Sequence, residues 1–184
     1  MKRNATNALI TIICGFYLLG LLIPSLQEHL FLLNKAILSD GAIHGVATGE
    51  WYRILTVALV HGGLMHLAFN MWALFVLGNP IERAFGRNRF LAIFFISLIT
   101  GSLATLALSP VNQPSVGASG ALFGLFGALA VTGRKIGVDV RSIMVLIGIN
   151  FAIGFMLPNI DWHAHLGGLI GGAIAAKVLL RQRA

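Results

Sequence analysis

Two residues with the chemistry of acyl transfer, Ser119 and His165, lie in separate apolar segments that are rich in glycine. Nucleophilic or ionisable side chains inside a bilayer cost free energy, and they are therefore functional candidates wherever they occur there. A histidine beside a serine can take the hydroxyl proton as the oxygen attacks a carbonyl carbon, so this pair is the minimum apparatus for acyl transfer. The pair indicates an enzyme that does nucleophilic chemistry within a membrane.

The composition is that of an integral membrane protein. The 184 residues are 57% hydrophobic and 10% charged, whereas soluble domains are about one-quarter charged. The sequence predicts a single domain over 1–184, an all-α polytopic membrane protein with six transmembrane helices and an uncleaved first helix. The six apolar runs that predict these helices are 8–26, 62–80, 90–108, 115–132, 142–158 and 163–180.

The basic residues predict the orientation in the membrane. With a cytoplasmic N-terminus, eleven Lys and Arg residues fall in the inner segments and only Lys35 and Arg53 in the outer ones. This positive-inside bias predicts that both termini are cytoplasmic. The net charge of +7 is then a topology signal with some attraction to anionic lipids. No basic surface interleaved with aromatic residues is available for nucleic acid.

The longest predicted loop, roughly 27–61, is apolar for a segment between membrane helices. Such a loop is expected to lie in or on the outer leaflet, as an interfacial helix does. Within it, Trp51 and Arg53 fit an anchor at the level of the lipid headgroups, where aromatic rings and long cationic side chains are both favourable.

Each residue of the Ser–His pair has a simpler interpretation when it is taken alone. A single serine in a membrane helix usually mediates packing, and a single histidine is as often part of an interhelical hydrogen bond as a catalytic base. Depth favours catalysis, because Ser119 and His165 each follow an outer turn by about one turn of helix. Both side chains are therefore expected at one depth below the outer surface.

Small residues at helical spacing provide a way for the two segments to meet. Gly120 and Gly124 lie on one face of the serine helix, and Gly168 and Gly172 repeat this spacing in the histidine helix. Such faces let two helix backbones approach closely in lipid. If the faces pack together, the short serine and histidine side chains come within hydrogen-bond reach.

Two further polar residues, His66 and Asn70, share one face in the outer half of the second apolar run. Two donors directed at one point could stabilise an oxyanion; the alternatives are an interhelical hydrogen-bond pair or half of a metal site. Metal is disfavoured, because no carboxylate shares that face and no two histidines are spaced i,i+4. Asp161, four residues before His165, is interpreted as a solvated loop residue, so no triad is predicted.

Taken in order, these motifs resemble the rhomboid intramembrane serine proteases in their minimal six-helix bacterial form. The resemblance covers essentially the whole chain, and the ordered set of motifs is far more specific than any one of them. The motifs are Trp51–Arg53, His66–Asn70, Gly117–Gly120 and Ala164–Gly168.

The resemblance implies a role for each matched residue. Ser119 would be the nucleophile and His165 the general base, working as a dyad without an acid. The Ser119 backbone amide and the side chains of His66 and Asn70 would form the oxyanion hole. Supporting roles are implied for the remaining matched residues, which are His61, Gly117, Phe123, Gly168 and Gly172. Phe123 stands where the family often has a stacking tyrosine.

The resemblance also implies the reaction and its partners. The expected activity is that of a serine endopeptidase in a bacterial inner membrane, opening to the extracytoplasmic side. It would cleave transmembrane protein substrates near their outer ends, and membrane lipids would be its other partners. A peptide bond inside a helix is hydrogen-bonded and shielded, so the substrate must unwind locally first. No cofactor and no metal are implied.

Two other functions remain open at this point. A rhomboid-like protein without activity could bind transmembrane helices for membrane-protein quality control, although such relatives usually lack the serine or the histidine. A small transporter or channel could use the outer histidines. The transporter is disfavoured because all the acidic residues, Glu82 and Asp161 among them, are expected in loops, which leaves no proton relay inside the membrane.

Overall fold

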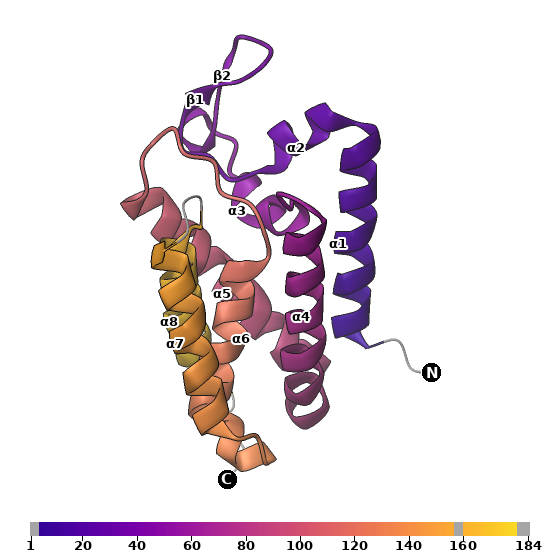
Figure 1. The fold of residues 1–184 in the computed structure, drawn as a ribbon, viewed down its shortest axis with the longest axis vertical. Coiled ribbons are helices and arrows are strands. Elements are labelled where there is room, and N and C mark those ends of the chain that lie inside the picture. Colours follow the sequence, from indigo (N-terminus) through magenta and orange to yellow (C-terminus); the bar gives the residue numbers. More distant parts are fainter. Residues whose placement is uncertain (1–3, 157–159, 180–184) are drawn as a thin grey trace.

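The computed structural model describes residues 4–156 and 160–179, and it forms one helical bundle (Figure 1). Within these residues, a helix of 14 residues or more occupies each of the six predicted runs, so the all-α class is confirmed. The long helices are α1 (Ala5–Leu22), α4 (Leu64–Phe85), α5 (Arg87–Leu108), α6 (Ser119–Thr132), α7 (Val140–Met156) and α8 (Trp162–Leu179). The shorter elements are α2 (Pro24–Leu30), β1 (Ala36–Ile37), β2 (Ile43–His44), η1 (Val46–Thr48), α3 (Arg53–Thr56), η2 (Val57–Leu59) and η3 (Gly133–Ile136).

Length and apolarity together separate the six long helices into two groups. Among the described residues, α1, α4 and α5 are long and apolar enough to cross a membrane, and α7 is apolar but shorter. With 14 residues, α6 extends about 21 Å, which is less than the hydrocarbon thickness of about 30 Å. The count of six spans stays a prediction for α6, α7 and α8.

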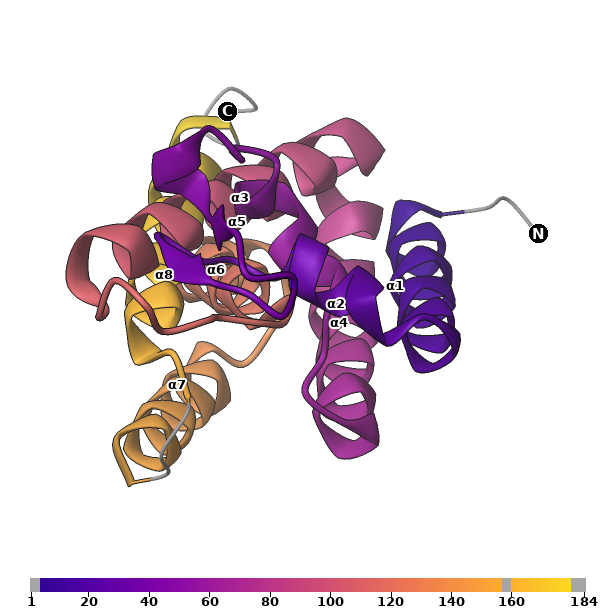
Figure 2. The same ribbon diagram turned by 90° about the horizontal axis from the view of Figure 1, so that it is seen from above.

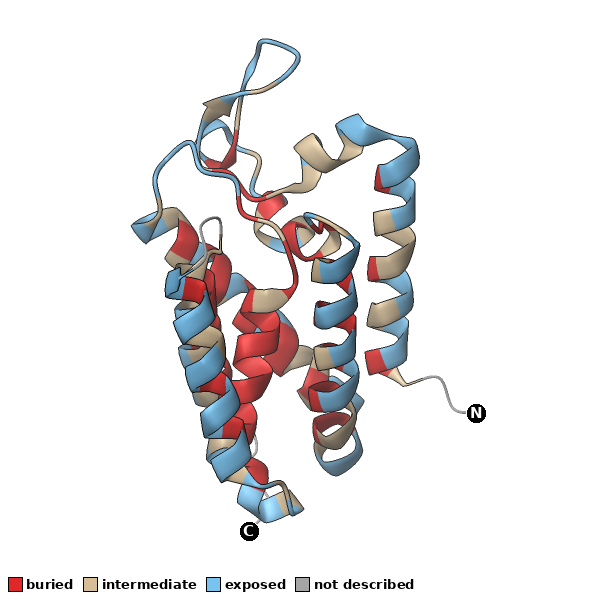
Figure 3. Ribbon diagram, viewed as in Figure 1, coloured by how far each residue is buried: buried red, intermediate tan, exposed pale blue. Residues whose placement is uncertain are grey.

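Helix α6 occupies the centre of the bundle. Seen from above, α4, α5, α7 and α8 surround it (Figure 2), and each of them packs against it. Most of α6 is buried, whereas α1 and α7 expose much of their surface (Figure 3). The segment between α5 and α6 passes over the upper end of the bundle and then descends between the helices before α6 begins (Figure 1).

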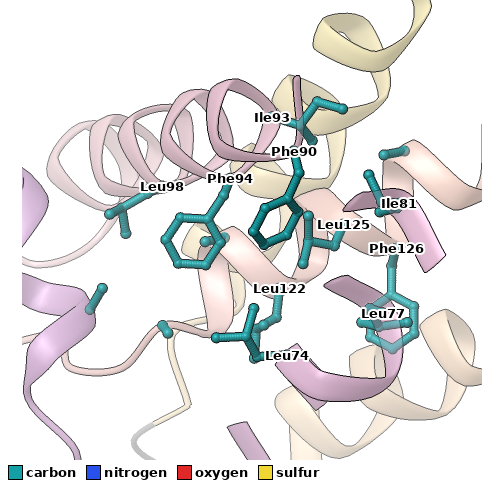
Figure 4. Close-up of a cluster of buried hydrophobic side chains, with 14 of the residues drawn as sticks. Leu74, Leu77, Ile81, Phe90, Ile93, Phe94, Leu98, Leu122, Leu125 and Phe126 are labelled. Atoms are coloured by element: carbon teal, nitrogen blue, oxygen red, sulfur yellow. The ribbon is translucent and has the colours of Figure 1, made fainter. Parts of the chain in front are cut away.

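The hydrophobic core lies where α4, α5 and α6 meet (Figure 4). Large apolar side chains spaced three or four residues apart on each helix point into this region, as expected for the inner face of a packed helix. This packing fixes α6 relative to two long helices. The labelled side chains of the cluster are Leu74, Leu77, Ile81, Phe90, Ile93, Phe94, Leu98, Leu122, Leu125 and Phe126.

Helix α4 continues past the predicted end of its run, through Pro80 to Phe85. The sequence predicts Glu82 in a loop; it is instead a buried helical residue. Its carboxylate accepts hydrogen bonds from the N–H groups of Ala5 and Thr6 and from the Thr6 hydroxyl, at 2.6–2.8 Å. These donors belong to the first turn of α1, whose N–H groups have no partner within that helix. The expectation that every acidic residue lies in a loop is therefore wrong.

The loop between α1 and α4 is built around a buried arginine. Arg53, which the sequence predicts as a headgroup anchor, has no exposed surface, whereas Trp51 is 64% exposed. The Arg53 Nε donates to a Glu50 carboxylate oxygen at 2.7 Å, and Nη1 donates to the carbonyl oxygens of Glu28 and Phe31 at 2.8 Å. A buried charge is tolerated when it is paired in this way. Arg53 thus connects separate parts of the loop through its hydrogen bonds, and it is not the headgroup anchor that the sequence predicts.

Candidate active site

Ser119 and His165 face each other where α6 meets α8. Ser119 is the first residue of α6, and His165 lies in the first turn of α8. The Ser119 hydroxyl oxygen lies 3.1 Å from Nε2 of His165. A hydroxyl that donates to Nε2 requires the neutral ring with its proton on Nδ1, which is the form that a general base needs. The structure thus brings together the two residues that the sequence singles out.

Contacts between small residues hold α6 and α8 close enough for this approach. A Cβ atom on Gly168 would overlap the carbonyl oxygen of Gly120, and one on Gly172 would overlap that of Gly124. The two helices therefore touch through their backbones, as small-residue faces allow in membrane bundles. The side chains of Ser119 and His165 are short, so they can form a hydrogen bond only if the two helices lie close together. The backbone contacts deeper in the bundle hold the helices at that short separation.

Aromatic rings surround the imidazole of His165. Phe123, one turn after Ser119 on α6, packs its ring on one face of the imidazole. Phe151 of α7 approaches edge-on, with ring centroids 6.4 Å apart. His165 is buried, and no described residue forms a hydrogen bond with its Nδ1. Within the described part of the chain, the imidazole of His165 therefore has no carboxylate hydrogen-bond partner and packs between aromatic rings.

Gly117 makes the turn that delivers the chain to Ser119. Its φ of 113° lies in the region that favours glycine. A Cβ atom here would also lie 2.9 Å from Nε2 and Cε1 of His66, which is too close for a side chain. The Gly117 N–H donates to the carbonyl oxygen of Val57 at 3.0 Å. Conformation and space thus both require glycine two residues before the serine.

His66 lies beside this turn in an orientation suited to donating a hydrogen bond. Its Nδ1 accepts from the N–H of Gly62 at 3.4 Å, so the neutral ring carries its proton on Nε2, next to Gly117. Asn70, one turn later on α4, is buried and donates one amide hydrogen to the His66 carbonyl oxygen at 2.9 Å. An amide group carries two hydrogens, so the second amide hydrogen of Asn70 is not used in this bond. The buried ring of His61 packs edge-on against His66, with centroids 5.1 Å apart.

Asp161 is where the sequence interpretation fails. Instead of lying in solvent, its side chain is 15% exposed. The carboxylate accepts hydrogen bonds from the hydroxyls of Thr105 and Ser115 and from the N–H of Ala164, so it also caps α8. A short acidic residue just before an apolar helix is a sequence signal for such a cap. Nothing in the sequence indicates the other two partners, which lie 56 and 46 residues away.

The described residues that meet at this site offer a hydroxyl, an imidazole and hydrogen-bond donors. Among residues 4–156 and 160–179, no three His, Cys, Asp or Glu side chains lie close enough to hold a metal ion. A hydroxyl beside a neutral imidazole can perform nucleophilic acyl transfer with protein groups alone.

A family model and two bacterial relatives carry the same family name. A family model for the Rhomboid domain matches residues 48–182. "Rhomboid protease GluP" of Bacillus subtilis (strain 168) is 48% identical over 139 residues, which are 73% of this chain but only 27% of GluP. "Putative rhomboid protease YdcA" of the same organism is 37% identical over 145 residues, which cover 76% of this chain and 72% of YdcA.

A plant relative has a different description. "Inactive RHOMBOID-like protein 8" of Arabidopsis thaliana is 39% identical over 139 residues, which are 71% of this chain and 39% of that protein. Relatives named as proteases and a relative named as inactive are thus similar to this sequence over nearly equal shares of its length, 71% to 76%. The family model nevertheless covers most of the chain, and the chain belongs to the rhomboid family.

Proposed function

We propose that this protein is an intramembrane serine endopeptidase that cleaves transmembrane protein substrates with a Ser119–His165 dyad. The observation that carries the proposal is the 3.1 Å separation of the Ser119 hydroxyl from Nε2 of His165. Both groups come from apolar helices of a bundle whose relatives include proteins described as rhomboid proteases. A hydroxyl within hydrogen-bond reach of a base is the geometry that nucleophilic catalysis needs.

In the proposed reaction, each of these groups has a defined role. The Ser119 oxygen attacks the scissile carbonyl carbon while Nε2 of His165 takes its proton. The N–H of Ser119 and the side chains of His66 and Asn70 donate to the resulting oxyanion. The C–N bond then breaks, and His165 returns its proton to the leaving amine. Water, activated by the same imidazole, hydrolyses the acyl-enzyme and restores the serine.

The depth of the site sets what the substrate must do. Because the chain descends into the bundle before α6 begins (Figure 1), Ser119 lies below the end of the bundle that carries the 27–61 loop. We assign this end to the extracytoplasmic side of the cell membrane, as the distribution of basic residues predicts. A substrate helix must unwind near its outer end before its carbonyl groups are accessible.

A helix-binding role without catalysis is the second candidate. The similarity to a relative described as inactive favours it, because binding of transmembrane helices does not need a reactive serine. In that case a probe that reacts covalently with activated serines, such as a fluorophosphonate, would leave Ser119 unlabelled.

The test is cleavage of a reporter transmembrane substrate by the purified protein in liposomes. Wild-type protein is compared with Ser119→Ala and His165→Ala, and each variant is checked for folding by thermal unfolding. We expect cleavage by wild type and a loss of at least about 10³-fold in both variants. Cleavage that survives Ser119→Ala in full would contradict the mechanism. Labelling by a fluorophosphonate serves as the control for a poorly chosen substrate, because it needs only the activated serine.

A further inference from the structure

The carboxylate of Asp161 joins three segments at the outer end of the bundle. Its Oδ2 accepts hydrogen bonds from Ser115 Oγ at 2.7 Å and from Thr105 Oγ1 at 2.5 Å. Its Oδ1 accepts from the N–H of Ala164 at 3.0 Å. Ser115 and Thr105 are themselves buried. One side chain thus connects the last turn of α5, the segment before α6 and the first turn of α8.

The spacing of these residues ties the carboxylate to both members of the dyad. Ser115 precedes Ser119 by four residues, and Asp161 precedes His165 by four residues. We call residues 115–118 the serine arm. Among the described residues, and apart from the bond between Ser119 and His165, the bond between Ser115 and Asp161 is the only side-chain hydrogen bond that joins residues 115–119 to residues 161–165.

The backbone of the serine arm is bonded to a different part of the molecule, the 27–61 loop. Ser115 exchanges backbone hydrogen bonds with Leu32 at 2.8 and 3.0 Å, and Gly117 donates to Val57. These bonds attach the arm to the 27–61 loop, which is not part of α8. The glycine contacts between α6 and α8 lie deeper than Ser119. Outward of Gly120, and apart from the Ser119–His165 bond, Asp161 therefore makes the side-chain hydrogen bond that holds residues 115–118 against the start of α8.

Asp161 does not have the position of a triad acid. The Nδ1 of His165 has no hydrogen-bond partner among the described residues, and both carboxylate oxygens of Asp161 already accept bonds from other groups. Any effect of Asp161 on the histidine must therefore pass through the backbone that it holds. A displacement of about 1 Å between reacting groups can cost about 10²-fold in rate.

We propose that Asp161 is a positioning residue, which holds Ser119 and His165 in register by binding Ser115 across the junction of α6 and α8. This inference rests on the proposed protease function for its kinetic consequence. Its structural consequence, that the arm 115–118 is held against α8, is independent of that function. Ser115 and Thr105 are the partners through which Asp161 acts.

Two substitutions separate this role from capping. In Asp161→Ser, the hydroxyl can still cap α8 but is too short to reach Ser115 and Thr105. In Asp161→Asn, the side chain keeps its length, caps through its oxygen and can donate its amide hydrogens to both hydroxyl oxygens. We expect Asp161→Ser to lower kcat by about 10- to 100-fold with KM nearly unchanged. Asp161→Asn should restore most of kcat.

Asp139 provides a matched control. It accepts hydrogen bonds from the N–H of Arg141 at 3.0 Å and from Ser142 Oγ at 2.6 Å, so it is also a capping carboxylate with a serine hydroxyl as partner. Both partners lie next to it in the chain, at the start of α7, so it joins no distant segments. Asp139→Ser should therefore leave kcat unchanged in the same reporter assay.

The measurement combines kcat and KM on the reporter substrate with amide hydrogen exchange of residues 115–119 in liposomes. Asp161→Ser should raise exchange in this segment, Asp161→Asn should not, and Ser115→Ala should lower kcat without adding to the effect of Asp161→Ser. Unchanged exchange in Asp161→Ser, or kcat effects of Ser115→Ala and Asp161→Ser that simply add, would overturn the proposal. If wild type neither cleaves nor is labelled, the protease function fails, and exchange still decides whether Asp161 holds the arm.

Discussion

The ring of Phe123 lies parallel to the imidazole of His165, with ring centroids 4.0 Å apart and an angle of 8° between the planes. Phe123 stands four residues after Ser119, so one face of α6 carries both Ser119 and the ring on which His165 stacks. The plane of the imidazole ring, which contains the Nε2 lone pair, is therefore supported by the helix that carries the serine.

This stacking predicts a specific pattern of substitutions at position 123. Removing the ring in Phe123→Ala frees the imidazole to rotate, and we expect kcat to fall by about 10-fold, in line with the stacking energy of one aromatic pair. Phe123→Tyr keeps the stacking surface and should keep kcat. Steady-state cleavage of the reporter measures both, and equal losses in the two variants would show that stacking is not the reason.

The backbone contact between α6 and α8 predicts a strong effect of one added methyl group. Gly168→Ala places a Cβ against the carbonyl oxygen of Gly120, so the helices must separate and both cleavage and thermal stability should fall. The matched control is Gly148→Ala in α7, where a Cβ meets nothing within 4 Å. That variant should be neutral or slightly more stable, because alanine favours helix over glycine by about 1 kcal/mol. Similar losses in both variants would argue against a special contact at Gly168.

The donors beside Gly117 predict losses in kcat without losses in binding. Removing one oxyanion donor typically lowers kcat by about 10² to 10³-fold, and we expect this for His66→Ala and Asn70→Ala. KM should change little, because the donors act on charge that develops only in the transition state. A rise in KM with unchanged kcat would instead assign these residues to substrate binding.

The outer loop predicts a dependence of stability on pH. Hydrogen bonds with Glu50 and Asp40 raise the pKa of His44 above its ordinary 6.5. Burial opposes ionisation of Glu50, but bonds from His44, Arg53 and the Gly45 N–H outweigh it and lower its pKa from 4.5 to about 2.

The sign of each contribution follows from these shifts. The raised pKa of His44 stabilises the loop below pH 6.5, and this stabilisation is lost as the pH rises through the folded pKa. The lowered pKa of Glu50 stabilises it above pH 4.5, and this is lost as the pH falls toward about 2. Hydrogen exchange of residues 36–50, corrected for the intrinsic rate, should therefore increase above neutral pH. His44→Gln should remove this increase, and an increase that persists in the variant would assign it to another group.

Local patterns predicted much of this structure, and distant partners account for what they missed. The length of the apolar runs placed the six long helices, and glycine spacing indicated that α6 and α8 could meet. The burial of Arg53 and Glu82 and the hydrogen bonds of Asp161 were not predictable, because each residue is stabilised by groups 22 to 77 residues away. From the sequence alone, a charged residue is predicted to be exposed to solvent, because its distant hydrogen-bond partners become its neighbours only in the folded chain.

Helix α6 begins at Ser119, and this has an electrostatic consequence. The aligned peptide dipoles of a helix place about half a positive charge at its N-terminus. An oxyanion formed at Ser119 would lie at that positive end, inside a bundle where water and ions screen the field poorly. The helix that carries the serine would then contribute to stabilising the charge the serine creates, and this contribution should change little with ionic strength.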